Sequence, residues 1–181
     1  TGGIKESNSG GQGAQVLARL GYAAIVLEGK PNDDNLYKVF INKDGATIET
    51  DNSLKMLGNY DLVDKLRAQY GEKVACISIG QAGEMKMGAA SIAFSDMEQR
   101  PTRHAGRGGV GAVMGTKGIK VIVIDDNGAT PRQAADPDKF KEYTKEVRKL
   151  FEAHPVMGES LRRYGTANIV NTTNASESKH H

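Results

Sequence analysis

The chain has 181 residues, which is enough for one domain with a substantial core and a piece of a second. Lysine and arginine number 24 against 22 aspartates and glutamates, so the net charge of +2 gives no electrostatic footprint for nucleic acid. No run of about 18 apolar residues predicts a membrane span, and no signal peptide is recognisable. With one cysteine, we expect a cytoplasmic protein without disulfides that binds neither nucleic acid nor a membrane.

Residues 1–13 are rich in glycine and short polar side chains and lead into a short helix expected over residues 14–21. Asn8 and Ser9 offer groups suited to helix capping, to a turn or to holding a metal-bound ligand. Composition alone leaves a flexible linker as the alternative for this segment.

Several strands and one helix are expected in the middle of the chain. Apolar runs predict strands at residues 22–28, 37–42, 46–50, 74–79 and 89–94. The turn at residues 43–45 suits a hairpin, and a helix is expected over residues 61–70, ending at Gly71. Cys76 lies in the strand at 74–79, where a buried structural thiol is favoured over a nucleophile.

The most informative segment is the run from Arg103 to Gly109, Arg-His-Ala-Gly-Arg-Gly-Gly, followed by residues that can enter a short helix. Glycine lets the backbone approach a ligand closely, and arginine donates several hydrogen bonds to phosphate or carboxylate oxygens. Amides at a helix start add to the attraction for anions. The run predicts a bed for a phosphorylated or otherwise anionic ligand. A glycine turn that only packs a helix against a sheet is the alternative.

The same run contains a dinucleotide-binding fingerprint, G-x-G-x-x-G, at Gly106, Gly108 and Gly111. That fingerprint requires a strand immediately before it. Residues 98–104 are charged and interrupted by Pro101, so we do not expect a strand there. The fingerprint is therefore interpreted as a chance match.

A continuous apolar strand is expected at residues 119–124, and the polar, proline-containing stretch that follows marks a domain boundary. Residues 138–151 predict an amphipathic helix with Pro137 near its first turn. Its apolar stripe comprises Phe140, Tyr143 or Thr144, Val147 and Leu150 or Phe151. Hairpins and few helices favour an α+β fold over a doubly wound parallel sheet.

Five segments occur in a characteristic order: Thr-Gly-Gly, Asn-Ser-Gly-Gly, Gly-Tyr-Ala-Ala-Ile-Val-Leu-Glu-Gly-Lys, Gly-Gln-Ala-Gly-Glu, and Ala-Gly-Arg-Gly-Gly-Val-Gly-Ala-Val-Met-Gly-Thr-Lys-Gly-Ile-Lys. In this order they resemble the N-terminal cofactor-binding domain of the aldehyde ferredoxin oxidoreductase family of tungsten or molybdenum enzymes. The resemblance implies paired, mostly antiparallel sheets with small helices. It places an N-terminally incomplete cofactor platform at 1–127 and the start of a helical domain at 131–170. The polar end of the chain at 171–181 is interpreted as a disordered tail with a tag remnant.

The resemblance implies a tungsto- or molybdo-bis-pterin, a magnesium ion bridging the pterin phosphates and a [4Fe–4S] cluster. It implies oxidation of an aldehyde to a carboxylic acid with electron transfer to ferredoxin. The positions that match the family's cofactor contacts are Asn8, Ser9, Gly10, Arg103, His104, Ala105, Gly106 and Arg107. Backbone carbonyls of Asn8 and His104 would reach the magnesium.

His104 stands where the family pattern suggests a small residue. If only its carbonyl is used, the difference is harmless. If its ring faces the pterin, the ring can donate a proton or tune specificity. A solvent-facing imidazole is the alternative.

A lone cysteine cannot supply the four thiolates that an iron–sulfur cluster usually takes, so the cluster ligands are expected outside this chain. Glu6, Glu84 and His104 are the titratable residues near the glycine motifs, and none is assigned as a catalytic base. We expect a fragment that is inactive alone and a homo-oligomer that covers its unpaired strand edges. Two alternatives stay open: a family member with a non-aldehyde substrate, and a non-redox module that binds a phosphate-bearing ligand.

Overall fold

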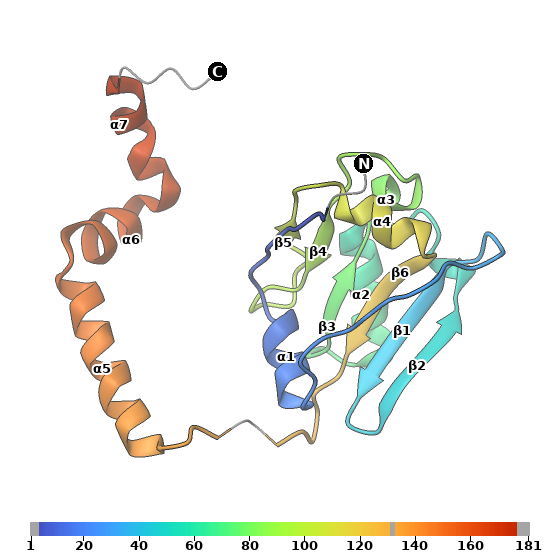
Figure 1. Ribbon diagram of the computed structural model, residues 1–181, viewed down its shortest axis with the longest axis horizontal. Helices are drawn as coiled ribbons and strands as arrows, with labels where there is room; N and C mark the ends of the chain where they lie inside the picture. Colours follow the sequence, from blue (N-terminus) through green and yellow to red (C-terminus); the bar gives the residue numbers. More distant parts are fainter. Residues whose placement is uncertain (1–3, 131–132, 177–181) are drawn as a thin grey trace. The chain divides into compact units, whose positions relative to one another are not determined.

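A computed structural model describes residues 4–130 and 133–176 of the chain (Figure 1). The chain separates into two compact units, one up to Arg132 and one from Gln133 onward. The segment boundaries expected from the sequence stay predictions, and residues 1–3 and 177–181 lie outside the described part.

The first unit is built on one six-stranded sheet with the order β2-β1-β6-β3-β4-β5 (Figure 1). Its strands are β1 (Tyr37–Asn42), β2 (Gly45–Thr50), β3 (Ala75–Ser78), β4 (Ile92–Phe94), β5 (Arg103–Ala105) and β6 (Ile119–Ile124). The β1–β6 pair is parallel, and every other neighbouring pair is antiparallel. The α+β class and the mostly antiparallel pairing expected from the sequence are confirmed.

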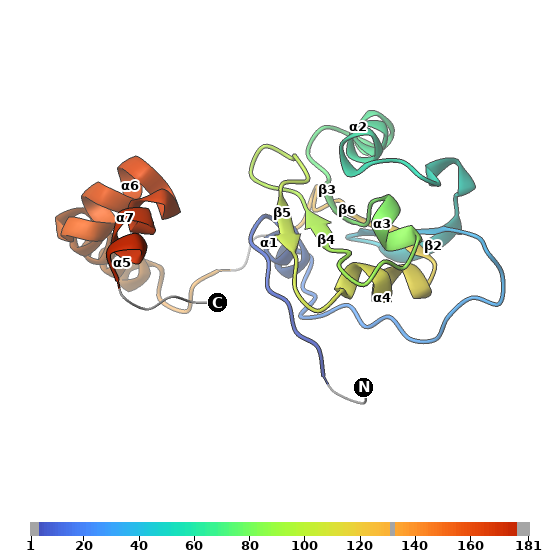
Figure 2. The same cartoon turned by 90° about the horizontal axis from the view of Figure 1, so that it is seen from above.

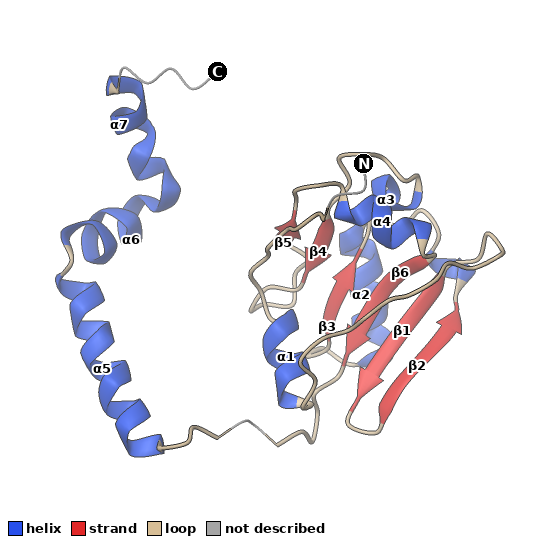
Figure 3. Cartoon of the chain, viewed as in Figure 1, coloured by secondary structure: helices blue, strands red, loops and turns tan. Residues whose placement is uncertain are grey.

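Helices cover both faces of this sheet, as Figures 2 and 3 show. They are α1 (Gly13–Arg19), the 3₁₀ turn η1 (Asn52–Leu54), α2 (Asn59–Tyr70), α3 (Gln81–Glu84) and α4 (Val110–Thr116). Val121 and Val123 of β6 pack in a core with α2, whereas Ile122 and Ile124 pack on the other face with α1 and α4. The described residues therefore form one sheet with helices on both faces, whereas the sequence led us to expect paired sheets.

The strand expected at residues 22–28 is absent, because these residues form an irregular segment that crosses the α1 face of the sheet (Figure 1). Ile25 and Leu27 pack against the core, while Val26 between them is 76% exposed. This alternation of buried and exposed residues is the pattern expected of a strand. The side chains of the segment pack in the core, but its backbone does not pair with the sheet.

A short strand, β5, does occur where residues 98–104 were expected to contain none. It forms three residue pairs with β4 and lies at the edge of the sheet, so Arg103 and His104 can stay exposed. Through β4 and β3, β5 runs opposite to β6. The unit from β5 through α4 to β6 is therefore no parallel crossover, and the dinucleotide-binding interpretation stays excluded.

The glycines of the second cluster divide into two groups. A Cβ atom on Gly111 would lie 2.4 Å from the Ser91 carbonyl oxygen, and one on Gly115 would lie 2.0 Å from that of Gly83. These glycines let α4 approach residues 83–91 closely. For them, the alternative interpretation of the glycine run, in which the glycines serve helix packing, is correct. A Cβ atom on Gly106 would meet nothing within 4 Å, so packing does not account for that glycine.

A buried ion pair joins α3 to β6. The ammonium group of Lys120 donates to the Leu57 carbonyl oxygen at 2.8 Å and pairs with Glu84, whose carboxylate also accepts from the amide of Met56. Burial lowers the pKa of Lys120, and Glu84 opposes that shift. Glu84 thus has a structural partner.

The second unit contains α5 (Pro137–Ala153), the π-helical turn η2 (Pro155–Ser160), α6 (Leu161–Tyr164), η3 (Gly165–Ile169) and α7 (Val170–Ala175). The amphipathic helix expected at 138–151 is confirmed as α5, and Asp136 caps it by accepting from the Lys139 amide. None of the described residues of this unit is buried, so the stripe containing Phe140 and Val147 is exposed. Residues 171–175, assigned from the sequence to a disordered tail, lie in α7. Within the two described segments, no helix is long and apolar enough to cross a membrane.

The close approach of α4 gives a prediction about stability. Gly115→Ala should lower the free energy of unfolding by about 1–3 kcal/mol, because the added methyl group overlaps the Gly83 carbonyl. Gly106→Ala is the matched control and should leave the urea midpoint nearly unchanged. Equal midpoints for the two variants would contradict this account of α4 packing.

The sequence-based interpretation of Cys76 as a structural thiol is confirmed, because the side chain is buried in β3 and free of disulfides. Burial raises the pKa of the Cys76 thiol to about 12. We therefore predict negligible reaction with Ellman's reagent at about pH 8 in the native state and stoichiometric reaction in denaturing urea. Rapid native-state labelling would show that β3 opens readily.

Candidate functional site

The segment before α1 runs along the outer edge of β5 (Figure 1). The amide of Arg107 donates to the Ser7 hydroxyl oxygen at 3.0 Å. At the other end of β5, a Cβ atom on Gly10 would lie 4.0 Å from Cδ of Arg103. The two segments therefore run antiparallel to each other, and the structure brings the two glycine clusters of the sequence side by side.

These two segments line an open cavity of about 740 Å³. Its lining residues are Glu6, Ser7, Asn8, His104, Gly106 and Arg107. Four of the eight residues expected at the site, Asn8, His104, Gly106 and Arg107, are among them. The other four flank the cavity: Ala105 is buried, the Ser9 hydroxyl donates to the Gly10 carbonyl, and the Arg103 side chain lies beside Gly10.

Several side chains around this cavity can donate hydrogen bonds. Arg107 supplies a guanidinium group, and Asn8 supplies an amide that donates to Glu6 Oε1 at 3.1 Å. Nδ1 of His104 and the Ser91 hydroxyl lie 2.9 Å apart in a hydrogen bond. With no atom near the missing side chain of Gly106, a ligand can approach the backbone there. This combination suits a multi-oxygen anion.

The start of α4 offers fewer free backbone amides to an anion than the sequence indicates. The amide of Gly111 in its first turn donates to the Ala90 carbonyl oxygen at 2.9 Å. A Cβ atom on Gly109 would lie 2.4 Å from the Gly88 carbonyl oxygen. Because the helix start packs on residues 88–91, the expectation that its amides face the anion is wrong for Gly111.

A second cavity, of about 650 Å³, lies between residues 30–36, Lys55 and the end of α3. Three lysines line it, but three carboxylates do as well. It contains none of the residues expected at the site. The charges balance in both cavities, so the presence of the expected residues Asn8, His104, Gly106 and Arg107 selects the cavity beside β5 as the candidate site.

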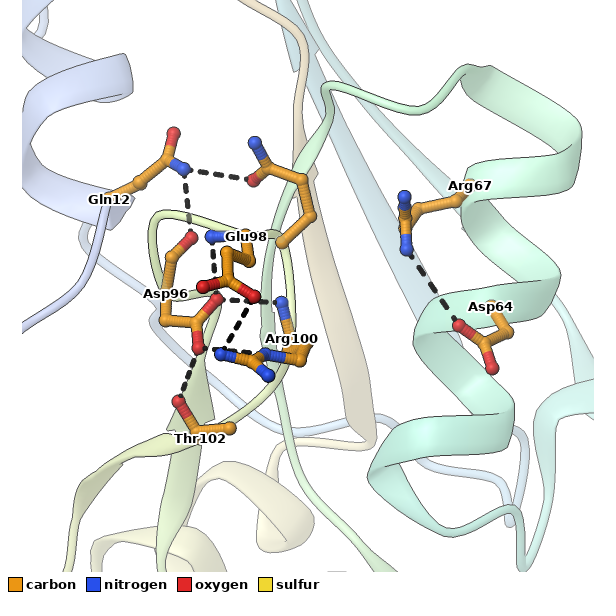
Figure 4. A network of polar contacts seen from close by, with 8 residues as sticks. Gln12, Asp64, Arg67, Asp96, Glu98, Arg100 and Thr102 are labelled. Carbon is orange, nitrogen blue, oxygen red and sulfur yellow. Dashed lines mark hydrogen bonds and ion pairs between the residues drawn. The ribbon is translucent and has the colours of Figure 1, made fainter.

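Gln12 anchors the segment before α1, and sequence reasoning missed it. Its amide donates to the Ser95 carbonyl oxygen at 2.8 Å, and its side-chain Nε2 donates to the Asp96 carbonyl oxygen, also at 2.8 Å (Figure 4). Both contacts link the first glycine cluster to the loop that leads into β5. No periodicity marks a lone glutamine among glycines, so only the fold reveals this contact.

The carboxylate of Asp96 organises the loop at 96–102 (Figure 4). It accepts from the amides of Glu98 and Arg100 at 2.8 and 3.0 Å and from the Thr102 hydroxyl at 2.8 Å. Burial alone would raise the pKa of Asp96, but these donors and the Arg100 guanidinium lower it to about 2. An aspartate two residues before a backbone donor is an Asx-turn signal that the sequence did offer.

Comparison with known proteins agrees with this arrangement. Residues 1–126 match the model for the aldehyde ferredoxin oxidoreductase N-terminal domain. The chain belongs to the aldehyde ferredoxin oxidoreductase family. The resemblance read from the glycine motifs is thus confirmed.

Three relatives illustrate the breadth of the aldehyde ferredoxin oxidoreductase family. A tungsten-containing aldehyde ferredoxin oxidoreductase of Pyrococcus horikoshii is 37% identical over 96% of this chain and 27% of its own length. An aliphatic sulfonate oxidoreductase, WOR-like subunit, of Pyrococcus furiosus is 30% identical over 83% of this chain and 24% of its own length. The active site complex BamBC of benzoyl coenzyme A reductase in complex with 1,5 dienoyl-CoA aligns with a TM-score of 0.71 and 30% identity, over 81% of this chain and 21% of that one.

The chain thus spans about a quarter of the length of the relatives it matches. Across residues 4–130 and 133–176, no group of three or more histidine, cysteine, aspartate or glutamate side chains is arranged to hold a metal ion.

The depressed pKa of Asp96 gives a prediction about pH. The carboxylate is stabilised relative to the unfolded chain, so its contribution is complete above about pH 4 and is lost as the pH falls towards about 2. Asp96→Asn should lower the melting temperature at neutral pH, and the gap from the wild type should close over that interval. Asp44→Asn, in the exposed hairpin turn, is the control. A pH-independent gap would contradict the assignment.

Proposed function

We propose that this chain is the cofactor-binding part of a tungsten- or molybdenum-pterin oxidoreductase that oxidises aldehydes to carboxylic acids. The observation that carries the proposal is the cavity shared by the two glycine segments in a domain of this family. Family members named for tungsten and for aldehyde oxidation match nearly the whole chain. Electrons would leave to ferredoxin.

The residues around the cavity fit the phosphate end of such a cofactor. The guanidinium of Arg107 and the amide of Asn8 would bind phosphate oxygens, and the bare backbone at Gly106 leaves room for them. Backbone carbonyls of Asn8 and His104 would hold the bridging magnesium, beside the carboxylate of Glu6. The bound cofactor would supply the two-electron chemistry through its dithiolene-held metal.

Ser9, Gly10, Arg103 and Ala105 would act as supports. Arg103 lies against the Gly10 backbone, so it would hold the first glycine segment in place beside β5. Buried Ala105 would anchor the strand from which the loop to Arg107 emerges. Of the eight residues expected at the site, the four that line the cavity would thus contact the ligand, and the other four would position them.

The iron–sulfur cluster would be held elsewhere in the protein, because the one cysteine of this chain is buried in β3. Substrate contacts and proton-transfer groups would come from the same outside parts. A cytoplasmic location and a homo-oligomeric state remain predictions for the whole protein.

A second candidate is a member of the family with a non-aldehyde substrate. Relatives named for aliphatic sulfonate oxidation and for benzoyl coenzyme A reduction share this domain. Because the proposed contacts reach the cofactor and not the substrate, the same cavity serves either reaction. A non-redox module that binds a phosphate-bearing ligand would share the cavity but lack metal.

Metal and pterin content tests the proposal. In a polypeptide of the relatives' length, grown with tungstate and molybdate, Gly106→Val should reduce bound metal and extractable pterin by at least about tenfold, because the side chain fills the space beside the phosphates. Gly88→Val is the matched control, since its Cβ also meets nothing but lies outside the cavity. Full occupancy in the Gly106 variant would refute the site. A wild-type protein free of pterin would favour the non-redox module.

A further inference from the structure

The ring of His104 is held in one orientation by Ser91, the residue directly before β4. In the β4–β5 ladder, His104 lies opposite Ala93, which follows Ser91 by two residues, so Ser91 stands diagonally to His104. Such diagonal neighbours are within reach of a long side chain. Their side chains meet, with Nδ1 of His104 and Oγ of Ser91 2.9 Å apart.

The other ring nitrogen of His104 is available to a ligand. His104 lines the cavity together with Arg107 and Asn8. Over the described residues, the structure records no hydrogen-bond partner for Nε2. When the Ser91 hydroxyl donates to Nδ1, the ring hydrogen of a neutral imidazole sits on Nε2. Nε2 then becomes a donor at the same cavity as a guanidinium and a side-chain amide.

We propose that the His104 side chain binds the anionic ligand through a hydrogen bond from Nε2, and that Ser91 is the positioning residue that fixes the ring. The inference rests on the proposed binding of a phosphate-bearing cofactor and adds a side-chain role to a residue expected to act through its carbonyl. The ligand group recognised is a tetrahedral, multi-oxygen anion such as a phosphate or diphosphate.

The charges around the cavity favour an extra neutral donor for an anion. Glu6 lines the same space, and its carboxylate repels an anion. Its hydrogen bond from Asn8 takes one of the two amide hydrogens of that residue. A neutral donor on the β5 side strengthens anion binding without adding charge. Two donors from one short segment, at His104 and Arg107, also select for an anion with several oxygens.

The test uses the 181-residue chain and inorganic pyrophosphate, measured by isothermal titration calorimetry. His104→Phe keeps the ring shape without a donor and should weaken binding about tenfold, as expected for one hydrogen bond to a charged ligand. His104→Gln restores a donor near the position of Nε2 and should recover most of the affinity. His154→Phe, in the second unit, is the control and should bind like the wild type.

A spectroscopic signature tests the role of Ser91. Long-range ¹H–¹⁵N correlation spectra should show His104 of the wild type as the Nε2–H tautomer, and pyrophosphate should shift the Nε2 resonance. Ser91→Ala should produce a tautomer mixture and weaken binding by a few fold, and Ser91→Thr should restore both. A merely structural role for Ser91 would leave the tautomer unchanged.

Each outcome decides the inference. Equal affinity of the wild type and His104→Phe, with unchanged far-ultraviolet circular dichroism, overturns it. A wild-type chain that binds no pyrophosphate, or an Nδ1–H tautomer, also overturns it. The proposed function fails separately, through the metal and pterin content of the longer protein, so failure of one is distinguishable from failure of the other.

Discussion

Two hydrogen bonds from Gln12 hold the first glycine segment against the outer edge of β5, and the candidate site depends on this attachment. One bond leaves from the backbone and the other from the side chain, and both end on carbonyl oxygens of neighbouring residues in the loop after β4. That loop is itself fixed by Asp96. A segment almost without apolar side chains has little burial to stabilise its position, so polar contacts with a rigid partner have to provide it.

The second glycine cluster contains glycines needed for helix packing and a glycine with open space beside it, and composition alone does not distinguish them. Gly111 and Gly115 serve the packing of α4, because neighbouring carbonyl groups occupy the space of a side chain. Gly106 has open space in front of it and precedes the arginine that faces the cavity. The packing interpretation is thus confirmed for Gly111 and Gly115, whereas the open space at Gly106 agrees with the ligand-binding interpretation, which stays a prediction. Close packing of α4 also fixes the loop from which Arg107 projects.

Sequence reasoning was sufficient where a local signal coincided with the tertiary outcome. The hairpin of β1 and β2, helix α2 with its end at Gly71, and the fully buried β6 follow from turn chemistry and apolar periodicity. It failed at residues 22–28, where alternation reflects packing across a sheet face. It failed again at β5, whose polar composition is tolerated only at an edge.

The dependence on local sequence signals also explains which residues around the candidate site could be predicted. Asn8, His104, Gly106 and Arg107, which line the cavity, were expected because their motifs resemble a family pattern. The local contacts of Asp96 with residues 98–102 were missed although they carry an Asx-turn signal. Gln12 and Ser91 act through long-range contacts, with partners 84 residues away for Gln12 and 13 residues away for Ser91. No local pattern encodes such partners.

The proposed separation of cofactor binding from substrate binding would explain how one domain suits reactions of different kinds. Its cavity offers hydrogen-bond donors to an anion, and the described residues around it offer no side-chain cluster arranged for a metal ion. Binding energy from the phosphate end of a cofactor is independent of what reacts at its metal, because the reacting atoms lie elsewhere on the cofactor. Relatives named for aldehydes, for sulfonates and for an aromatic thioester can therefore retain the same sheet and loops. A side-chain donor at His104 would change how firmly the cofactor is held without dictating the substrate.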